Sequence, residues 1–454
     1  MNITIKPAYI ILGATLMLSA CGQEDISDGT TDTGERIIFR TALPDVSSRA
    51  AEITTDFSYF HLTAFNPADP DLIAESSTLS EYINNESIVK GLGQNVLTSD
   101  KCIWPAPGKD GNMSFFAYYP QLPSSASLAN GSTVSEGSAN IDYKIIDYSI
   151  APDIADQVDF VTASTTGSKA ENLFSGITLN FAHQLSRIEV KARGANESCN
   201  IEIAGVRIGG AGVKGTFDFS PAEGASAWTA LEKGNVEYIY REGEEIVSLP
   251  RKNSTQTTSD APVSIMGADL GSEANCAMLI PTTDATGWRY ADDRQNTGRG
   301  MYISVLMRIT DAAEAQQYPY TDNKEGLNAL NIPVVYLAVE NSTGKVKANP
   351  GKLYRGDDKY YTDSERTAEY VAPEGCTVKE FGWAAVPVTG EWKSGYIYTY
   401  TLDYTYGVGL HDPAVEGDVA PQAGDPVISD KVFVSVTVSG WKPGSENGVE
   451  VPRK

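Results

Sequence analysis

The sequence predicts an all-β protein built from two tandem antiparallel β-sandwich domains. The chain is rich in residues that favour strands and turns, with 23 Tyr, 41 Gly and 23 Pro among 454 residues. Apolar residues alternate with polar ones at period 2 in many short segments, which Gly, Pro, Asn or Asp separate. No strand pattern alternates regularly with a helical pattern, and this argues against a parallel α/β sheet.

The first element in the chain is a secretion signal. Lys6 supplies a positive charge, residues 8–18 are apolar, and small residues precede the cysteine in Leu18-Ser19-Ala20-Cys21. The apolar run is too short to span a bilayer of ~30 Å. The segment resembles a bacterial lipoprotein signal, which implies cleavage before Cys21, acylation of that residue and a lipid anchor in the outer membrane. We therefore assign residues 1–20 to the signal peptide and 21–35 to a polar tether.

Two sandwich domains follow, and we place them at residues 36–195 and 196–454, with the boundary near Gly194-Ala195-Asn196. The expected strands include residues 37–41, 57–65, 177–181, 188–192, 201–208, 301–309, 333–339 and 432–438. Residues 77–91 show some helical character. At 41% apolar residues the chain has ample material for buried cores.

Charge and cysteine content exclude several function classes. The formal net charge of −24 argues against binding nucleic acid, which is itself a polyanion. It also means that copies of the chain repel one another, so any polymer needs short-range forces such as backbone pairing. No CxxC pair exists, and we expect the remaining cysteines to be small buried hydrophobes, although a disulfide stays open; they are Cys102, Cys199, Cys276 and Cys376.

The motifs that carry catalysis are missing from the sequence. We expect His61 and His183 to be structural because both lie in strand patterns, and we place His411 in a loop. The segment Gly210-Ala211-Gly212-Val213-Lys214-Gly215 matches GxGxxG, but a strand pattern follows it where a dinucleotide site needs a helix. We interpret it as a Gly-rich β-turn. We expect no enzyme activity, no metal and no cofactor.

A stripe of tyrosines near the C-terminus has two interpretations. Apolar and aromatic residues alternate along one face at Tyr396, Tyr398, Tyr400, Leu402, Tyr404 and Tyr406. If the face is exposed, its rings can stack on sugars. If it covers a sandwich core, the hydroxyl groups reach water at the edge.

Several segments in order resemble the fimbrillin (major-fimbria-like) family of surface lipoproteins, whose members build or cap type V pili. The two most specific segments are Phe115-Phe116-Ala117-Tyr118-Tyr119-Pro120 and Phe181-Ala182-His183-Gln184-Leu185-Ser186-Arg187-Ile188. The others are the lipoprotein signal, the strand Ile37-Ile38-Phe39-Arg40, the loop at Arg49, Trp104-Pro105, the Tyr-rich strand from Gly395 and the last strand ending at Gly440-Trp441. Together they span most of the chain.

The resemblance implies a structural or adhesive pilus subunit with tandem β-sandwiches, located at the cell surface or in the fimbrium. It implies that an Arg-specific protease cuts the lipidated precursor, that the first strand leaves, and that a strand of a neighbouring subunit takes its place. We place the cut between Arg49 and Ala50, with Arg40 as the second candidate. Its partners would be other pilus subunits and, for an adhesive face, a host or glycan ligand.

The position of the subunit in the pilus stays open. After Trp441 only Lys442 to Lys454 remain, a short tail with two prolines and two glycines that makes a poor donor strand. A tip or minor subunit therefore competes with a stalk subunit. A second function class also competes, namely a surface glycan-binding lipoprotein of a nutrient-uptake system, and the tyrosine stripe is its best support.

Overall fold

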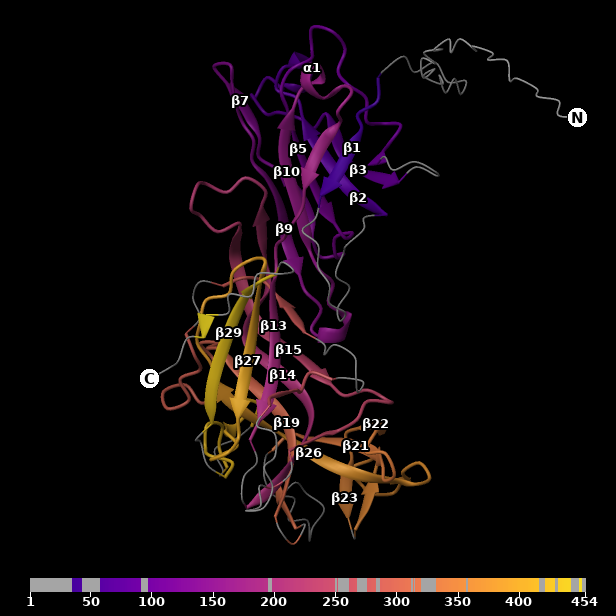
Figure 1. Ribbon diagram of the computed structural model, residues 1–454, viewed down its shortest axis with the longest axis vertical. Coiled ribbons are helices and arrows are strands. Elements are labelled where there is room, and N and C mark those ends of the chain that lie inside the picture. The colour runs from indigo at the N-terminus through magenta and orange to yellow at the C-terminus, as the bar shows by residue number, and fades with distance from the viewer. Residues whose placement is uncertain are drawn as a thin grey trace, which may run out of the picture. The chain divides into compact units, whose positions relative to one another are not determined.

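The computed structural model confirms the all-β class. It describes residues 35–42, 58–90, 97–194, 198–249, 251, 261–267, 276–282, 286–311, 313, 315–319, 332–356, 358–415, 421–428, 432–441 and 449–450. The chain divides into two units, Met1–Gly34 and Glu35–Lys454, and all described residues belong to the second. Strands make up most of this unit, and Figure 1 shows them as extended ribbons with very little helix.

An eight-stranded sheet contains most of the first strands in the chain. Its strands in spatial order are β11 (Ile177–Asn180), β1 (Phe39–Ala42), β4 (Leu97–Thr98), β3 (Ile83–Lys90), β2 (Tyr59–Phe65), β5 (Met113–Tyr119), β10 (Val161–Gly167) and β12 (Ala182–His183). Strand β5 is buried on both faces, because Phe115 belongs to one apolar cluster and Phe116 to another. This double burial explains why the segment reads as a nearly continuous apolar run.

Two further sheets share the largest apolar core. The eleven-stranded sheet follows the order β22 (Val346–Gly351), β21 (Val334–Glu340), β26 (Cys376–Pro387), β19 (Tyr302–Asp311), β14 (Cys199–Asp218), β9 (Tyr143–Ser149) and β6 (Ser127–Asn130), with β15 (Trp228–Ile239), β16 (Val247–Leu249), β20 (Gln316–Tyr318) and β28 (Leu410–His411) paired beside it. The six-stranded sheet follows the order β17 (Val263–Ser264), β13 (Ser186–Arg193), β27 (Tyr396–Asp403), β29 (Phe433–Gly440) and β30 (Val449–Glu450), with β18 (Ala277–Leu279) on β13. Ile188 and Leu402 of the six-stranded sheet lie in one core with Ile201 and Val305 of the eleven-stranded sheet.

The remaining elements are short. A three-stranded sheet consists of β23 (Tyr354–Gly356), β24 (Lys359–Tyr361) and β25 (Glu369–Tyr370), and a hairpin consists of β7 (Thr133–Ser135) and β8 (Ser138–Asn140). The helical turns are η1 (Pro70–Leu72), η2 (Ile154–Asp156) and α1 (Lys169–Asn172). Because β6 and β9 pair into the same sheet as β14, the chain crosses between sheets more than once. The division at residues 195 and 196 stays a prediction.

Pairing between strands that are distant in sequence includes two parallel ladders among the described residues. β1 runs parallel to β11, with Phe39 opposite Ile177, and β13 runs parallel to β27, with Ile188 opposite Tyr398. The other strand pairs in the described part of the chain are antiparallel, as expected. Alternation within a segment fixes which face is buried but says nothing about the direction of a remote partner.

Two expectations of local structure are wrong. The Gly-rich segment is no turn but the middle of the 20-residue strand β14, which bends at several register shifts. A side chain at Gly209 would clash with the Tyr302 ring, and Gly210 has φ +69° and lies against the backbone of the 299–300 loop. The glycines therefore let neighbouring chain segments approach closely. Residues 77–91 do not form a helix, since β3 occupies Ile83–Lys90.

Candidate strand-exchange site

Strand β1 is held by backbone hydrogen bonds from both sides. The Ile37 N–H donates to the Cys102 carbonyl at 2.8 Å, and the Trp104 N–H donates to the Glu35 carbonyl at 2.8 Å. On the opposite edge, Ile177 donates to the carbonyl of Ile38 at 2.8 Å. β1 therefore lies between β4 and β11 and is not an edge strand.

The side chains of this segment alternate between core and surface. Ile37 and Phe39 are fully buried, whereas Arg40 is exposed. The Phe39 ring centroid lies 6.1 Å from that of Phe60 and 6.1 Å from that of Phe115, both edge-to-face. Burying two such side chains contributes about 3–6 kcal/mol before conformational entropy is subtracted.

Ion pairs fasten the start of the segment at the surface. Arg36 lies 2.7 Å from Asp100, and Lys169 of α1 lies 2.7 Å from Glu35. The Arg36 and Asp100 side chains are 58% and 82% exposed, so their pair contributes less than about 1 kcal/mol. The apolar side chains and the backbone ladder therefore supply most of the attachment of β1.

The predicted site residues are only partly in view. Cys21, Arg49 and Ala50 lie outside the described residues. Arg40 lies in β1, directly opposite Thr178 of β11. Its side chain is accessible, but its backbone is part of the sheet.

The last long strand, β29, is the second element of the site. It pairs antiparallel with β27 over its full length, and Val434, Val436 and Val438 pack against the large core. On its outer side the described partner is the two-residue strand β30. Figure 1 shows β27 and β29 side by side.

Trp441, directly after β29, anchors the end of this strand. Its N–H donates to the Gly395 carbonyl at 2.7 Å, and its ring, which is 1% exposed, stacks on His183 with centroids 4.2 Å apart and planes 4° apart. His183 Nδ1 lies 2.8 Å from Oδ2 of the fully buried Asp159. Burial raises the pKa of Asp159, and the hydrogen bond from His183 opposes that rise. His183 is thus a structural histidine, as expected.

The tyrosine stripe is buried, so the exposed aromatic face is ruled out for most of its length. Tyr398, Tyr400 and Tyr404 are at most 6% exposed, while Tyr396 and Tyr406 at the two ends are 42% and 63% exposed. The hydroxyl groups do not reach water in the way expected. The Trp392 indole N–H donates to the Tyr400 oxygen at 3.0 Å, and the Lys393 N–H donates to the Tyr398 oxygen at 2.8 Å.

The other histidine and cysteine expectations are met in part. His411 lies in the strand β28 and is buried, so its placement in a loop is wrong. Burial lowers its pKa to about 4. All four cysteines after residue 100 are free thiols, and Cys102, Cys199 and Cys276 are buried while Cys376 is partly exposed. Within the described ranges, no group of three or more His, Cys, Asp or Glu side chains is arranged to hold a metal ion, and no helix there is long and apolar enough to cross a membrane.

Sequence reasoning missed the neighbours that form the site around β1. Leu97 of β4 and Ile177 of β11 pair with the same residue, Phe39, although 80 positions separate them in the chain. Trp104 was noted only as part of a motif, yet it is 3% exposed and its ring lies 6.5 Å from Phe115 in the same core. Alternation in 177–181 was the one signal available, and it could not specify the partner.

Comparison with known proteins agrees with this all-β fold. No match is found among curated proteins. Solved structures that resemble the chain include three proteins for which a role in cell adhesion has been suggested. The one from Parabacteroides distasonis is 11% identical, covering 89% of this chain and 100% of its own, with a TM-score of 0.36. Those from Bacteroides eggerthii and Bacteroides uniformis are 12% and 10% identical, cover 91% and 90% of this chain and 98% of their own, and both have a TM-score of 0.35.

A sequence-family model gives the assignment. The model described as fimbrillin-like matches residues 70–332, which is more than half of the chain. The matched range contains the strands β2 to β5 lack only in part and runs through β19, so it includes both β11 and the core shared by the two large sheets. The chain therefore belongs to the fimbrillin-like family.

Proposed function

We propose that this chain is a structural or adhesive subunit of a type V-like pilus, located at the cell surface. In this proposal it is exported as a lipoprotein acylated at Cys21, cut by an Arg-specific protease and assembled by exchange of β1 for a strand of another subunit. The proposal assigns no catalytic activity to the chain. The observation that carries it is the position of β1, a short terminal strand inserted between two others with its apolar side chains in the core.

Loss of β1 would leave a vacancy of defined chemistry. The N–H groups of Ile177 and Phe181 would lose their acceptors, the carbonyls of Ile38 and Ala42. The core around Phe60 and Phe115 would lose the Phe39 ring. Unpaired buried donors and an open apolar core are both costly, so an extended segment with apolar residues at alternate positions would bind there.

Net charge supports this mode of assembly. A chain of net charge −24 repels its own copies at long range, and salt screens that repulsion beyond about 10 Å. Backbone hydrogen bonds and apolar burial act at contact and do not depend on net charge. Strand addition is therefore suited to a polymer of so acidic a subunit.

The geometry around Arg40 supports a cut at Arg49. Proteases bind their substrates in extended form, but the backbone at Arg40 is already engaged with Thr178 of β11. A cut after Arg40 would first need β1 to leave the sheet. A cut between Arg49 and Ala50, which lie after β1, needs no such step.

The donor strand is the least determined part. β29 has the alternation that a donor needs, with Val434, Val436 and Val438 on its core face. Trp441 fixes its end, so this strand would leave only if that contact broke. Stalk, tip and anchor roles therefore stay open for experiment.

The test of this proposal is the N-terminus of the protein in assembled fibres. Sequencing should begin at Ala50, and an Arg49→Ala variant should remain intact from Cys21 and fail to enter fibres. The matched control is Arg40→Ala, which should assemble normally. An intact chain from Cys21 in wild-type fibres would contradict the cut, and antibody labelling by electron microscopy would then distinguish a basal anchor from a shaft or tip position.

The nutrient-uptake lipoprotein is not proposed as a second function. Its best support was an exposed aromatic face on the tyrosine stripe, and Tyr398, Tyr400 and Tyr404 are buried.

A further inference from the structure

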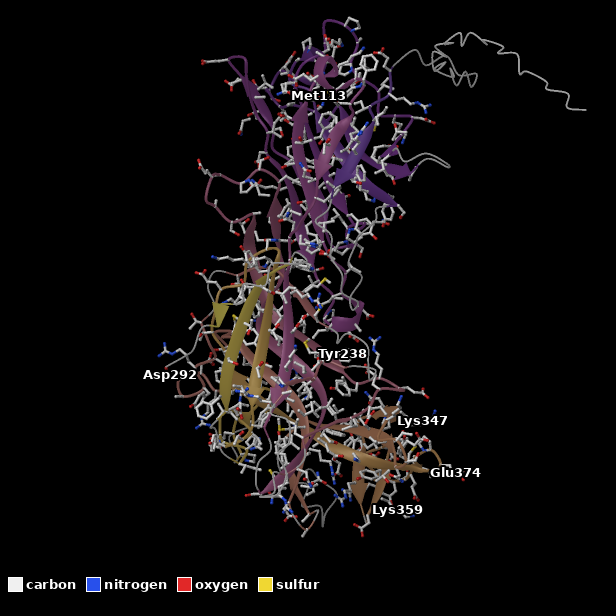
Figure 2. All side chains as sticks on the ribbon, viewed as in Figure 1. Met113, Tyr238, Asp292, Lys347, Lys359 and Glu374 are labelled. Carbon is white, nitrogen blue, oxygen red and sulfur yellow. The ribbon has the colours of Figure 1, made fainter. Side chains whose placement is uncertain are left out.

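The small sheet of β23, β24 and β25 has two faces of different composition. Tyr354 lies opposite Tyr361, and Tyr361 lies opposite Glu369, so these three share one face. Arg355, Tyr360 and Tyr370 share the other face by the same register. In Figure 1 β23 is drawn next to β21 and β26, and in Figure 2 Lys359 of β24 and Glu374 of the following loop are labelled in the same region.

The face of Tyr360 is attached to the eleven-stranded sheet. The Tyr360 hydroxyl donates to Glu380 Oε1 of β26 at 3.0 Å, and Arg355 Nη1 lies 3.4 Å from the same oxygen. Glu380 is 3% exposed, and the Tyr336 ring of β21 meets Tyr360 edge-to-face at 5.7 Å. These contacts fix the orientation of the small sheet, so the Tyr354 face points away from β26.

The outer face carries aromatic rings beside cations. The Lys352 ammonium lies 5.2 Å from the centre of the Tyr354 ring. Gly356 has no side chain, and the space where a Cβ would stand has Arg366 Cδ at 2.9 Å and Tyr361 Cε2 at 3.4 Å. The Arg366 side chain therefore packs over Gly356 beside the Tyr361 ring. Tyr354 and Tyr361 are both half-buried, which leaves part of each ring accessible.

The charge of this face is opposite to that of the whole chain. Its cations are Lys352, Lys359 and Arg366. Of the nearby carboxylates, Glu369 pairs with Lys359 at 2.8 Å, and Asp363 accepts hydrogen bonds from the N–H groups of Thr367 and Ala368. These hydrogen bonds lower the pKa of Asp363 and keep its charge turned into its own loop. On a chain of net charge −24, the face offers cations to an acidic ligand.

We propose that this outer face, made of Lys352, Tyr354, Lys359, Tyr361 and Arg366, binds a glycan whose sugars carry carboxylates. A tyrosine ring offers a flat surface to the C–H face of a sugar and costs little conformational entropy on binding. An arginine fork and a lysine ammonium bind a carboxylate. A peptide added as a strand is disfavoured, because β23 and β25 have three and two residues and offer few backbone groups. The inference gives the adhesive role in the proposed function a ligand class.

The test measures binding by the full, unassembled chain with isothermal titration calorimetry. Oligogalacturonate and sialyllactose are the two acidic probes, and they distinguish a uronate from a sialate ligand. Maltohexaose is the neutral probe and polyglutamate the acidic peptide probe. We expect binding to at least one acidic glycan and at least tenfold weaker binding to maltohexaose and polyglutamate.

Two variants test the face itself. Tyr361→Ala and Arg366→Gln should each weaken binding of the acidic glycan at least tenfold, with unchanged circular dichroism. The matched controls are Tyr406→Ala and Arg289→Gln, which alter an exposed tyrosine and an exposed arginine elsewhere and should bind within twofold of wild type. The uncut Arg49→Ala variant should also bind normally, which separates this inference from the assembly mechanism. Absence of binding to both acidic glycans, equal binding by the face variants, or equal binding of polyglutamate would each overturn the proposal.

Discussion

Replacement of Phe39 by alanine tests whether β1 is a separable plug. The Phe39 side chain is fully buried and contacts the Phe60 and Phe115 rings, so its loss removes both apolar burial and two edge-to-face contacts. Truncation of a buried Phe costs about 3–5 kcal/mol. If that cost falls on the attachment of β1, the strand should open about 100- to 3,000-fold more often, at about 1.4 kcal/mol for each factor of ten.

The assay is amide hydrogen exchange at Ile177 and Phe181. Both N–H groups donate to carbonyls of the β1 segment, so their exchange reports its departure. In Phe39→Ala we expect these two amides to exchange faster by the factor above, while amides of β19 in the large core change little. Arg40→Ala is the control on the same strand, since that side chain is exposed and its loss should change stability by less than about 0.5 kcal/mol.

One result would refute the reasoning. If Ile177 and Phe181 in Phe39→Ala exchanged only in step with the amides of β19, β1 would leave only when the whole molecule unfolds. A strand of that kind cannot be exchanged for another in a folded subunit.

Three further predictions follow from buried side chains. Trp441→Ala should destabilise β29 by about 3–5 kcal/mol and speed its amide exchange, whereas Phe433→Ala, at the exposed start of the same strand, should change stability by less than about 0.5 kcal/mol; equal effects of the two would contradict the anchoring role of Trp441. The folded-state pKa of His411, about 4, lies below its usual 6.5, so the unfolded state binds the extra proton between these values and stability should fall by up to about 3 kcal/mol as pH drops from 6.5 to 4. Denaturant titrations should show a smaller loss in His411→Gln over that range, and an unchanged pH dependence would argue against a depressed pKa. In the native protein a thiol reagent should modify Cys376 rapidly, and fast labelling at any of the buried thiols would contradict the fold around it; these are Cys102, Cys199 and Cys276.

Local patterns in the sequence were enough for the strands and their buried faces. Ile37 and Phe39 alternate with a surface residue and are buried, and the same holds for Ile188, Val190 and Ala192 in β13. Alternation at period 2 follows from strand geometry alone, so it can be read without knowledge of the partner. The family assignment also came from local motifs, because residues such as those in β5 are constrained on both faces at once.

The sequence by itself therefore determined that the chain is all-β and which residues of each strand face a core. It did not determine which strands meet, because pairing depends on chain closure over long separations, as between β1 and β11 or between β13 and β27. Only the tertiary structure decided that the tyrosine stripe is buried, that the glycines of β14 accommodate neighbouring backbone, and that Trp441 lies on His183. Each of these depends on what covers a face, and the covering segment is far away in the chain.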